Sequence, residues 1–184
     1  YFINKNLSCT FFPFCGENQA FNGIIRYLTV LYGGNVDEKK VVIVTQSSIH
    51  KNAYFGRFAV DLDNKDQDNY FVAEDEKDCW IKYDFVDRKV RPTFYSIRSR
   101  PNGTFNGQHL KSWVIEGSNN GNDKDLNDWK ILDERNEECL VGVDKQHTFD
   151  IKTNLEPNES FKYLRLRSTG LNSSGSKYLI FSAL

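Results

Sequence analysis

The sequence has 184 residues and a formal net charge of -1, from 24 Lys and Arg against 25 Asp and Glu. This length can bury one full core and argues against a second independent domain. The balanced charge excludes the overall positive field that recruits nucleic acid, and no apolar run approaches the roughly 20 residues needed to span a bilayer. Hydrophobic residues make up 39% and aromatic residues 14% of the chain, which favours a globular, β-rich protein.

The N-terminal part differs in pattern from the remainder. Residues 1–19 show no period, and we expect an irregular lead-in there. Apolar residues at helical spacing over 24–28 predict a short helix that ends near Gly33. We therefore predict an N-terminal extension with one helix over 1–36 and a single β-domain over 37–184.

Short strands dominate the β-domain. The β-branched run 41–45 predicts a buried strand, and the alternation over 58–62 predicts a strand with one exposed face. Further period-2 segments follow at 81–85, 95–97, 113–115, 129–131, 149–151, 164–166 and 178–181. In the first of these we expect Lys82 and Asp84 to face water. Many short strands without long helical segments between them predict an all-β fold, an antiparallel β-sandwich or jelly roll.

Several of these segments together carry a resemblance to a known family. They are 80–85, 95–99, 112–119, Trp129, and 163–167 with Thr169 and Gly170. In this order they resemble the F5/8 type C domain, also called discoidin-like, over residues 37–184. The resemblance implies a galactose-binding-like sandwich that recognises ligands through loops at one end and has no catalytic chemistry. Members of the family bind glycans, phospholipid membranes or proteins.

The chain departs from the secreted members of that family. It lacks the cysteine pair that often joins their ends, and Phe105 is the one obvious apolar side chain for entering a membrane. Intracellular versions, including those attached to BTB-domain proteins and ubiquitin-ligase assemblies, are more similar. Four Asn-x-Ser/Thr sequons would be glycosylated in a secreted protein: Asn6, Asn102, Asn158 and Asn172. We nevertheless expect an intracellular location over a secreted one.

Motifs for catalysis or for zinc are missing from the sequence. No GxSxG, HExxH, Walker loop or GxGxxG occurs, so we predict a protein that is not an enzyme. The four cysteines lack CxxC spacing and the three histidines are scattered, which argues against zinc. Many relatives hold a structural calcium ion, and Asp61 or Asp63 with backbone carbonyls could begin such a site here.

Two clusters are candidates for ligand binding. The first flanks a Gly-rich loop and consists of Arg98, Arg100, Asn102 and His109. On an extended strand Arg98 and Arg100 share one face, so two guanidinium groups could address a carboxylate or sugar hydroxyls. Alternatively, the arginines pair with acidic side chains on neighbouring strands and, like His109, order the loop.

The second cluster lies in the loop 46–55 and contains His50, Asn52 and Tyr54. Tyr54 could serve as a stacking platform for the face of a sugar. The polar loop 170–177 would be the third contributor to the same end of the sandwich. From these features we first expect a protein partner, with a carbohydrate as the alternative, a phospholipid membrane in third place and nucleic acid excluded.

Overall fold

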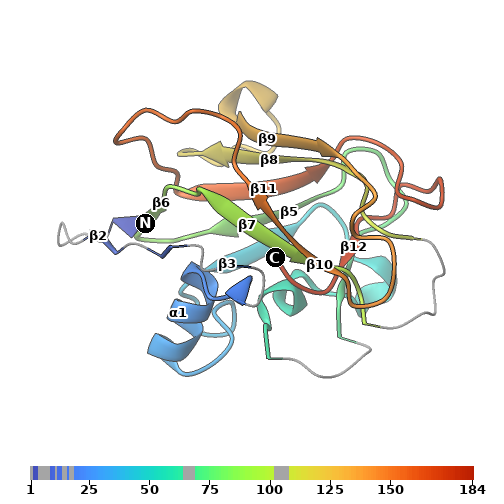
Figure 1. The fold of residues 1–184 in the computed structure, drawn as a ribbon, viewed down its shortest axis with the longest axis horizontal. Coiled ribbons are helices and arrows are strands. Elements are labelled where there is room, and N and C mark those ends of the chain that lie inside the picture. Colours follow the sequence, from blue (N-terminus) through green and yellow to red (C-terminus); the bar gives the residue numbers. More distant parts are fainter. Residues whose placement is uncertain are drawn as a thin grey trace.

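A five-stranded antiparallel sheet forms one layer of the computed structural model, which describes residues 2–3, 9–10, 12–13, 16, 19–63, 69–101 and 108–184. Its strand order is β3-β5-β11-β8-β9 (Figure 1). The strands are β3 (Ile43–Gln46), β5 (Trp80–Asp84), β11 (Tyr163–Ser168), β8 (Ser112–Ser118) and β9 (Lys130–Asn136). On β5 the side chains of Ile81 and Tyr83 are buried and their neighbours are partly exposed, which is the predicted period of two.

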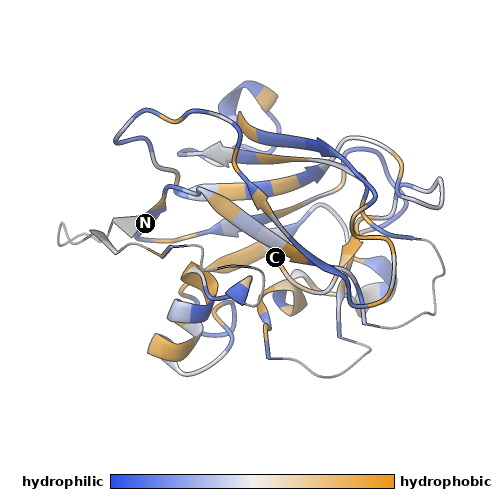
Figure 2. Ribbon diagram, viewed as in Figure 1, coloured by the Kyte–Doolittle hydropathy of each residue, from blue (hydrophilic) through white to orange (hydrophobic). Residues whose placement is uncertain are grey.

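The second layer is made of shorter antiparallel pairs. Strand β7 (Phe94–Arg98) pairs with β10 (Gln146–Asp150), and β4 (Phe71–Val72) pairs with β12 (Ile180–Phe181). An isolated bridge between Arg98 and Ala183 connects the two pairs. The layers meet where the ring of Trp113 on β8 contacts that of Phe149 on β10 at 5.2 Å. Figure 2 shows hydrophobic residues along the strands of both layers. The predicted all-β antiparallel sandwich is confirmed.

The N-terminal part packs onto the sandwich. Helix α1 (Ile24–Tyr32) ends at Gly33, whose φ of 66° is the left-handed conformation that glycine favours at a helix end. Within 1–19, β1 (Phe2–Ile3) pairs with β2 (Cys9–Thr10) and with β6 (Lys89–Val90) of the β-domain. The helix prediction is confirmed. No helix in the described ranges is long and apolar enough to cross a bilayer.

The division into 1–36 and 37–184 remains a prediction about folding units. In the structure Leu28 of α1 and Val36 are fully buried, and both belong to the same hydrophobic core as Ile81 and Trp113. The helix therefore supplies part of the core of the β-domain through its apolar face.

The strand predicted over 58–62 is wrong. Residues Gly56–Val60 instead form a 3₁₀ helix, η3, in which the consecutive residues Ala59 and Val60 are both fully buried. A strand would have turned one of these two side chains outward. The backbone N–H of Gly56 donates to the Gln46 side chain at 3.1 Å, and that oxygen occupies the space where a Cβ would lie. This close approach to the end of β3 favours a compact turn over an extended segment.

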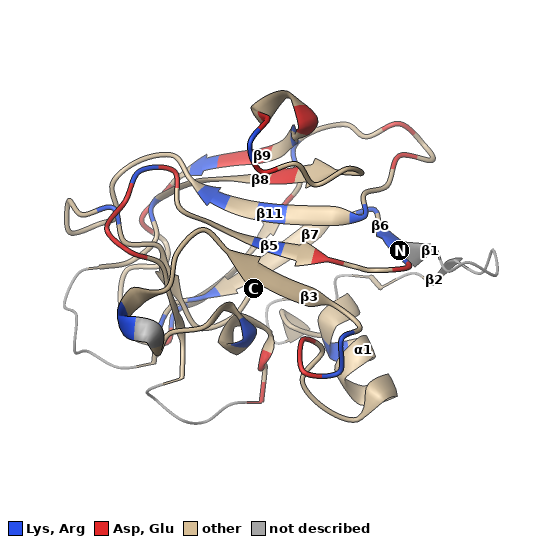
Figure 3. Ribbon diagram, turned by 180° about the vertical axis from the view of Figure 1, so that it is seen from behind, with Lys and Arg blue, Asp and Glu red and all other residues tan. Residues whose placement is uncertain are grey.

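The outer face of the five-stranded sheet is covered by paired charges. Glu116 on β8 accepts hydrogen bonds from Arg165 Nε at 2.8 Å and from Arg167 Nη2 at 2.6 Å. Arg165 also stacks on the Trp129 ring at 3.9 Å. Lys82 was expected to face water, but its side chain is only 13% exposed because it pairs with Asp123 in the β8–β9 connection. Figure 3 shows acidic and basic residues side by side on these strands.

Candidate functional site

The loops at one end of the sandwich bring His50 and Glu74 together. His50 lies in the 3₁₀ turn η2 (His50–Asn52), and its Nδ1 lies 2.9 Å from Glu74 Oε2. The next residue, Lys51, has a φ of 53°, a left-handed conformation that costs energy for a residue with a Cβ. Glu74 is fixed in turn, since its backbone N–H donates to Ser48 Oγ at 3.0 Å. Two loops that are distant in sequence thus hold one histidine–carboxylate pair.

Aromatic rings surround this pair. Tyr54 stacks on His50 with ring centroids 5.9 Å apart, and Tyr178 meets His50 edge-on at 5.3 Å. Tyr70 lies beneath, 4.9 Å from Tyr54 and only 1% exposed. Tyr54 and Tyr178 are half-buried, so part of each ring is open to solvent. The structure brings Tyr54 next to His50 of the same predicted cluster, and its role as a stacking platform stays a prediction. The two other tyrosines were not predicted.

Arg100 connects the two clusters predicted from the sequence. Its side chain is fully buried and interacts with Tyr70, the ring that supports Tyr54. Burial lowers the pKa of Arg100, and the interaction with Tyr70 opposes that shift. Because it is only 1% exposed, Arg100 supports the aromatic cluster from below and does not present its guanidinium to solvent.

Arg98 lies in different surroundings from Arg100. Its Nε donates to Ser182 Oγ at 3.1 Å, its guanidinium covers the Phe21 ring at 5.4 Å, and Asp144 lies 3.6 Å away. Strand β7 ends at Arg98, so the extended geometry that would align the two arginines does not continue to Arg100. The structure favours the alternative in which these arginines order the loops.

His109 joins the remaining loops to this end. Its Nε2 accepts a hydrogen bond from the Gly142 N–H at 3.2 Å, and its backbone N–H donates to Ser173 Oγ at 3.0 Å. Burial and then the neighbouring Arg100 lower the pKa of His109. The residue therefore orders loops in its neutral form. Asn102 lies outside the described residues, and of Asn52 only the backbone is described, in η2.

The loop 170–177 is organised by one buried asparagine. Asn172 is 6% exposed, and its Nδ2 donates to Ser176 Oγ at 2.7 Å and to the Tyr178 carbonyl at 3.2 Å. Its Oδ1 accepts from the Ser174 and Ser176 backbone N–H groups, each at 3.1 Å. These contacts fix the approach of Tyr178 to His50. The Asn-Ser-Ser-Gly-Ser sequence carries the signal for such an Asx turn.

Exposed apolar side chains that were not predicted from the sequence lie near His109. Val141 and Val143 flank Gly142 and are 43% and 51% exposed, and Leu171 is 50% exposed two residues before Ser173. Because His109 contacts both Gly142 and Ser173, the three side chains border the same end of the sandwich. They form an apolar border beside the aromatic cluster.

The calcium site predicted on Asp61 and Asp63 remains a prediction. Asp63 pairs with Arg26. Burial raises the pKa of Asp61, and the carboxylates of Asp63 and Glu38 raise it further. Calcium takes about six to eight oxygen ligands. In the described part of the chain, no group of three or more His, Cys, Asp or Glu side chains is arranged to hold a metal ion.

The chain matches no protein-family model and no curated protein sequence. Solved structures resemble it over most of its length. A CBM32 module of Clostridium perfringens, in complex with GalNAc-β-1,3-galactose, has a TM-score of 0.56 at 14% identity, covering 79% of this chain and 94% of that one. The family 32 module of C. perfringens NanJ, in complex with galactose, has a TM-score of 0.56 at 10% identity, covering 79% and 92%.

A lectin from an animal is also similar. The fucolectin of striped bass, Morone saxatilis, has a TM-score of 0.57 at 14% identity, covering 78% of this chain and 44% of the lectin chain. Identities this low describe the fold alone. The antiparallel layers, the strand order and these neighbours together show that the chain has the discoidin-like, galactose-binding β-sandwich fold that the sequence segments resemble.

Proposed function

We propose that this chain is a non-catalytic carbohydrate-binding module that takes its glycan at the His50–Glu74 end of the sandwich. The observation that carries the proposal is the combination of a fixed histidine–carboxylate pair with two half-exposed tyrosine rings. A sugar presents both an apolar C–H face and hydroxyl groups. Aromatic rings pack against the first, and ionisable side chains hydrogen-bond the second.

The polar atoms of this pair are only partly used. Nδ1 of His50 and Oε2 of Glu74 bond each other, but no described residue bonds His50 Nε2 or Glu74 Oε1. The Glu74 side chain is 39% exposed, so its second oxygen can be reached from solvent. Two sugar hydroxyls could therefore be bound together, one by Nε2 and one by Oε1. Tyr54 or Tyr178 would pack against the ring of the sugar.

The structural neighbours support a glycan over a protein partner, which was the first hypothesis from the sequence. Two of them were solved with galactose-containing ligands, and the third is a fucolectin. The sugars that these neighbours bind are not assigned to this chain, because 10–14% sequence identity preserves the fold and not the binding residues. We therefore propose the ligand class and leave the individual sugar to measurement.

A glycan array tests the proposal. We expect the chain to retain a defined set of glycans, with dissociation constants in the roughly millimolar to micromolar range. His50→Ala removes one hydrogen-bonding group and should weaken binding about tenfold or more, whereas His147→Ala should leave binding unchanged because that ring packs on Phe149 of β10. Retention of no glycan by the folded chain, or equal binding by both variants, would refute the proposal.

A further inference from the structure

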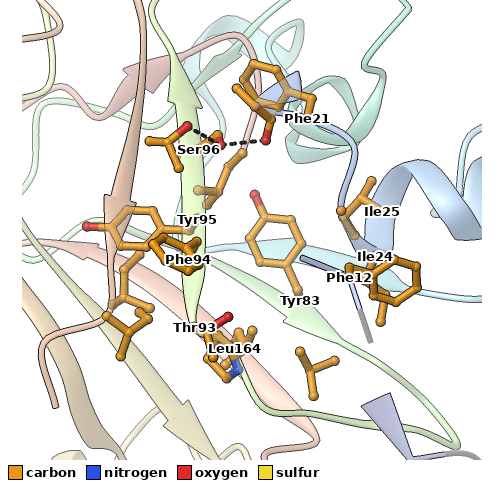
Figure 4. Close-up of a pocket in the computed structure, with 18 of the residues that line it drawn as sticks. Phe12, Phe21, Ile24, Ile25, Tyr83, Thr93, Phe94, Tyr95, Ser96 and Leu164 are labelled. Atoms are coloured by element: carbon orange, nitrogen blue, oxygen red, sulfur yellow. Dashed lines mark hydrogen bonds between the residues drawn. The ribbon is translucent and has the colours of Figure 1, made fainter. Parts of the chain in front are cut away.

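A second concave feature lies away from the loop end. A cavity of about 200 Å³ separates the N-terminal segment from the sandwich (Figure 4). Phe12, Phe21 and Ile25 line it from the N-terminal side, and Tyr83 and Leu164 line it from the five-stranded sheet. Its lining includes none of the loop-end residues His50, Tyr54, Glu74, Arg100 or Tyr178. The cavity is therefore a separate feature of the fold.

The walls of this cavity are mainly apolar, but one polar group inside is unsatisfied. Tyr83 is 5% exposed, and its buried hydroxyl has no hydrogen-bond partner among the described residues, so a small shift of the ring brings it to a molecule in the cavity. Figure 4 shows the Tyr83 ring within the cavity, between β7 and the N-terminal segment. Burial raises the pKa of Tyr83, so the hydroxyl keeps its proton and remains a donor. An unsatisfied buried hydroxyl is costly, and few occur in native proteins.

Two other polar side chains of the walls, those of Ser96 and Arg91, are already hydrogen-bonded. Ser96 Oγ donates to the Ala20 carbonyl at 2.6 Å and lies 2.9 Å from Thr148 Oγ1. The Arg91 guanidinium donates to the Leu155 carbonyl at 2.9 Å and to that of Glu156. No Asp or Glu is among the described residues that line the cavity. A cationic ligand would therefore find no counter-charge among these residues, and the Arg91 guanidinium is already held by backbone carbonyls. A water molecule needs about two to four polar partners to be held.

We propose that this cavity binds a small, uncharged, mainly apolar molecule that carries one oxygen atom, which accepts a hydrogen bond from the Tyr83 hydroxyl. An engineered apolar cavity of about 150 Å³ binds benzene, so the present volume accommodates an aromatic ring with a short substituent. A ligand enters at the Thr93–Phe94 side, because both residues line the cavity and are exposed. The site is independent of the glycan site proposed above.

Two ligands of the same shape test the role of the oxygen. Acetophenone has a carbonyl acceptor beside its ring, and α-methylstyrene has a CH₂ group in its place. Titration of the whole chain, followed through the methyl NMR signals of Ile25 and Leu164, should show acetophenone binding about three- to tenfold more tightly. Tyr83→Phe should bring the two affinities together by weakening acetophenone only.

Two further variants locate the binding. Ile25→Phe fills the cavity from α1 and should weaken both ligands, whereas His50→Ala at the loop end should change neither. Thermal melting of each variant shows whether it folds, and the comparison of the two ligands on the unsubstituted chain needs no variant. The proposal fails if neither ligand shifts these methyl signals at about 10 mM. It also fails if the two ligands bind the unsubstituted chain equally.

Discussion

Two regions of this molecule place a carboxylate against a basic side chain, and they differ in what remains free. At Glu116 the side chain is 3% exposed, and Arg165 and Arg167 occupy both of its oxygens. At Glu74 the side chain is 39% exposed, and His50 occupies one oxygen. A pair whose hydrogen-bonding capacity is used up can only hold the fold together. A pair with an unused oxygen and an unused ring nitrogen can also bind something else.

The largest expected effect is a loss of stability on substitution of Glu116, whose oxygens are both hydrogen-bonded. Glu116→Gln leaves Arg165, which is 1% exposed, without its hydrogen-bonded carboxylate, and only Asp123 at 3.6 Å remains as an opposite charge. Removing one member of a buried pair costs about 3–5 kcal/mol, and we expect a loss of about 3 kcal/mol because Gln retains one acceptor. Urea denaturation measures this loss. The matched control Glu134→Gln, at an exposed position of the neighbouring β9, should stay within about 0.5 kcal/mol. Equal stabilities of the two variants would contradict the comparison.

The same substitution at Glu74, in the His50–Glu74 pair, should affect glycan binding and not stability. Glu74→Gln removes the negative charge that strengthens hydrogen bonds to His50 and to a sugar hydroxyl, so we expect glycan affinity to fall about tenfold. The free energy of unfolding should change by less than about 1 kcal/mol, because this side chain is partly exposed. Calorimetric titration with the best glycan from the array measures the affinity. Glu76→Gln, at an exposed position two residues away, is the control and should bind normally.

His109 should make the loop end sensitive to acid. Burial and Arg100 lower the pKa of His109 in the folded chain, so below the ordinary pKa of about 6.5 the unfolded chain binds a proton more readily than the folded one. The stability contributed by neutral His109 is present above that pH and is lost as the pH falls through it. His109→Gln keeps an acceptor for the Gly142 N–H, and the variant should lose less stability between pH 7.5 and pH 5.5. Parallel pH profiles of the two proteins would remove this explanation.

The smallest expected effect lies outside both regions. Val86, just after β5, has a φ of 56° and is 38% exposed. A left-handed conformation is strained for a β-branched residue, so Val86→Gly should stabilise the protein by up to about 1 kcal/mol. Val86→Ala retains the Cβ and is the control without this gain. A loss of stability in the glycine variant, measured by thermal melting, would mean that the Val86 side chain contributes more than the strain costs.

The sandwich could be predicted because its signal is local. Ile81 and Tyr83 alternate with partly exposed neighbours, and the segments predicted at 113–115 and 129–131 fall largely in the antiparallel strands β8 and β9. The prediction failed at Gly56–Val60, where apolar spacing is compatible with a strand and with a 3₁₀ turn alike. It was also imperfect on β9. A β-bulge, seen as a register shift between Ile115 and Glu116, leaves Ile131 exposed and buries Leu132 and Asp133 together. The sequence of β9 contains no signal that predicts this bulge.

The candidate site was less predictable because its parts come from distant segments. His50 and Tyr54 could be named from one loop. Their partners Glu74 and Tyr178 lie in other loops and come close only in the folded chain. Glu74 belongs to a hydrophilic run, which by itself indicates a solvated surface. Arg98 and Arg100 were predicted as ligand contacts because of their charge. In the structure Arg100 is buried, and Arg98 is hydrogen-bonded to Ser182.

The burial of Asn172 determines when this residue can be glycosylated. An enzyme that attaches a glycan must reach the amide nitrogen, and in the folded protein that nitrogen already serves Ser176 and the Tyr178 carbonyl. The sequon at Asn172 can thus be modified only while the chain is still unfolded. A sugar added at that stage could not enter the buried position, and the loop that sets Tyr178 against His50 could not close. A chain that is glycosylated at Asn172 therefore cannot form the folded loop 170–177. A chain that has already folded this loop cannot be glycosylated at Asn172.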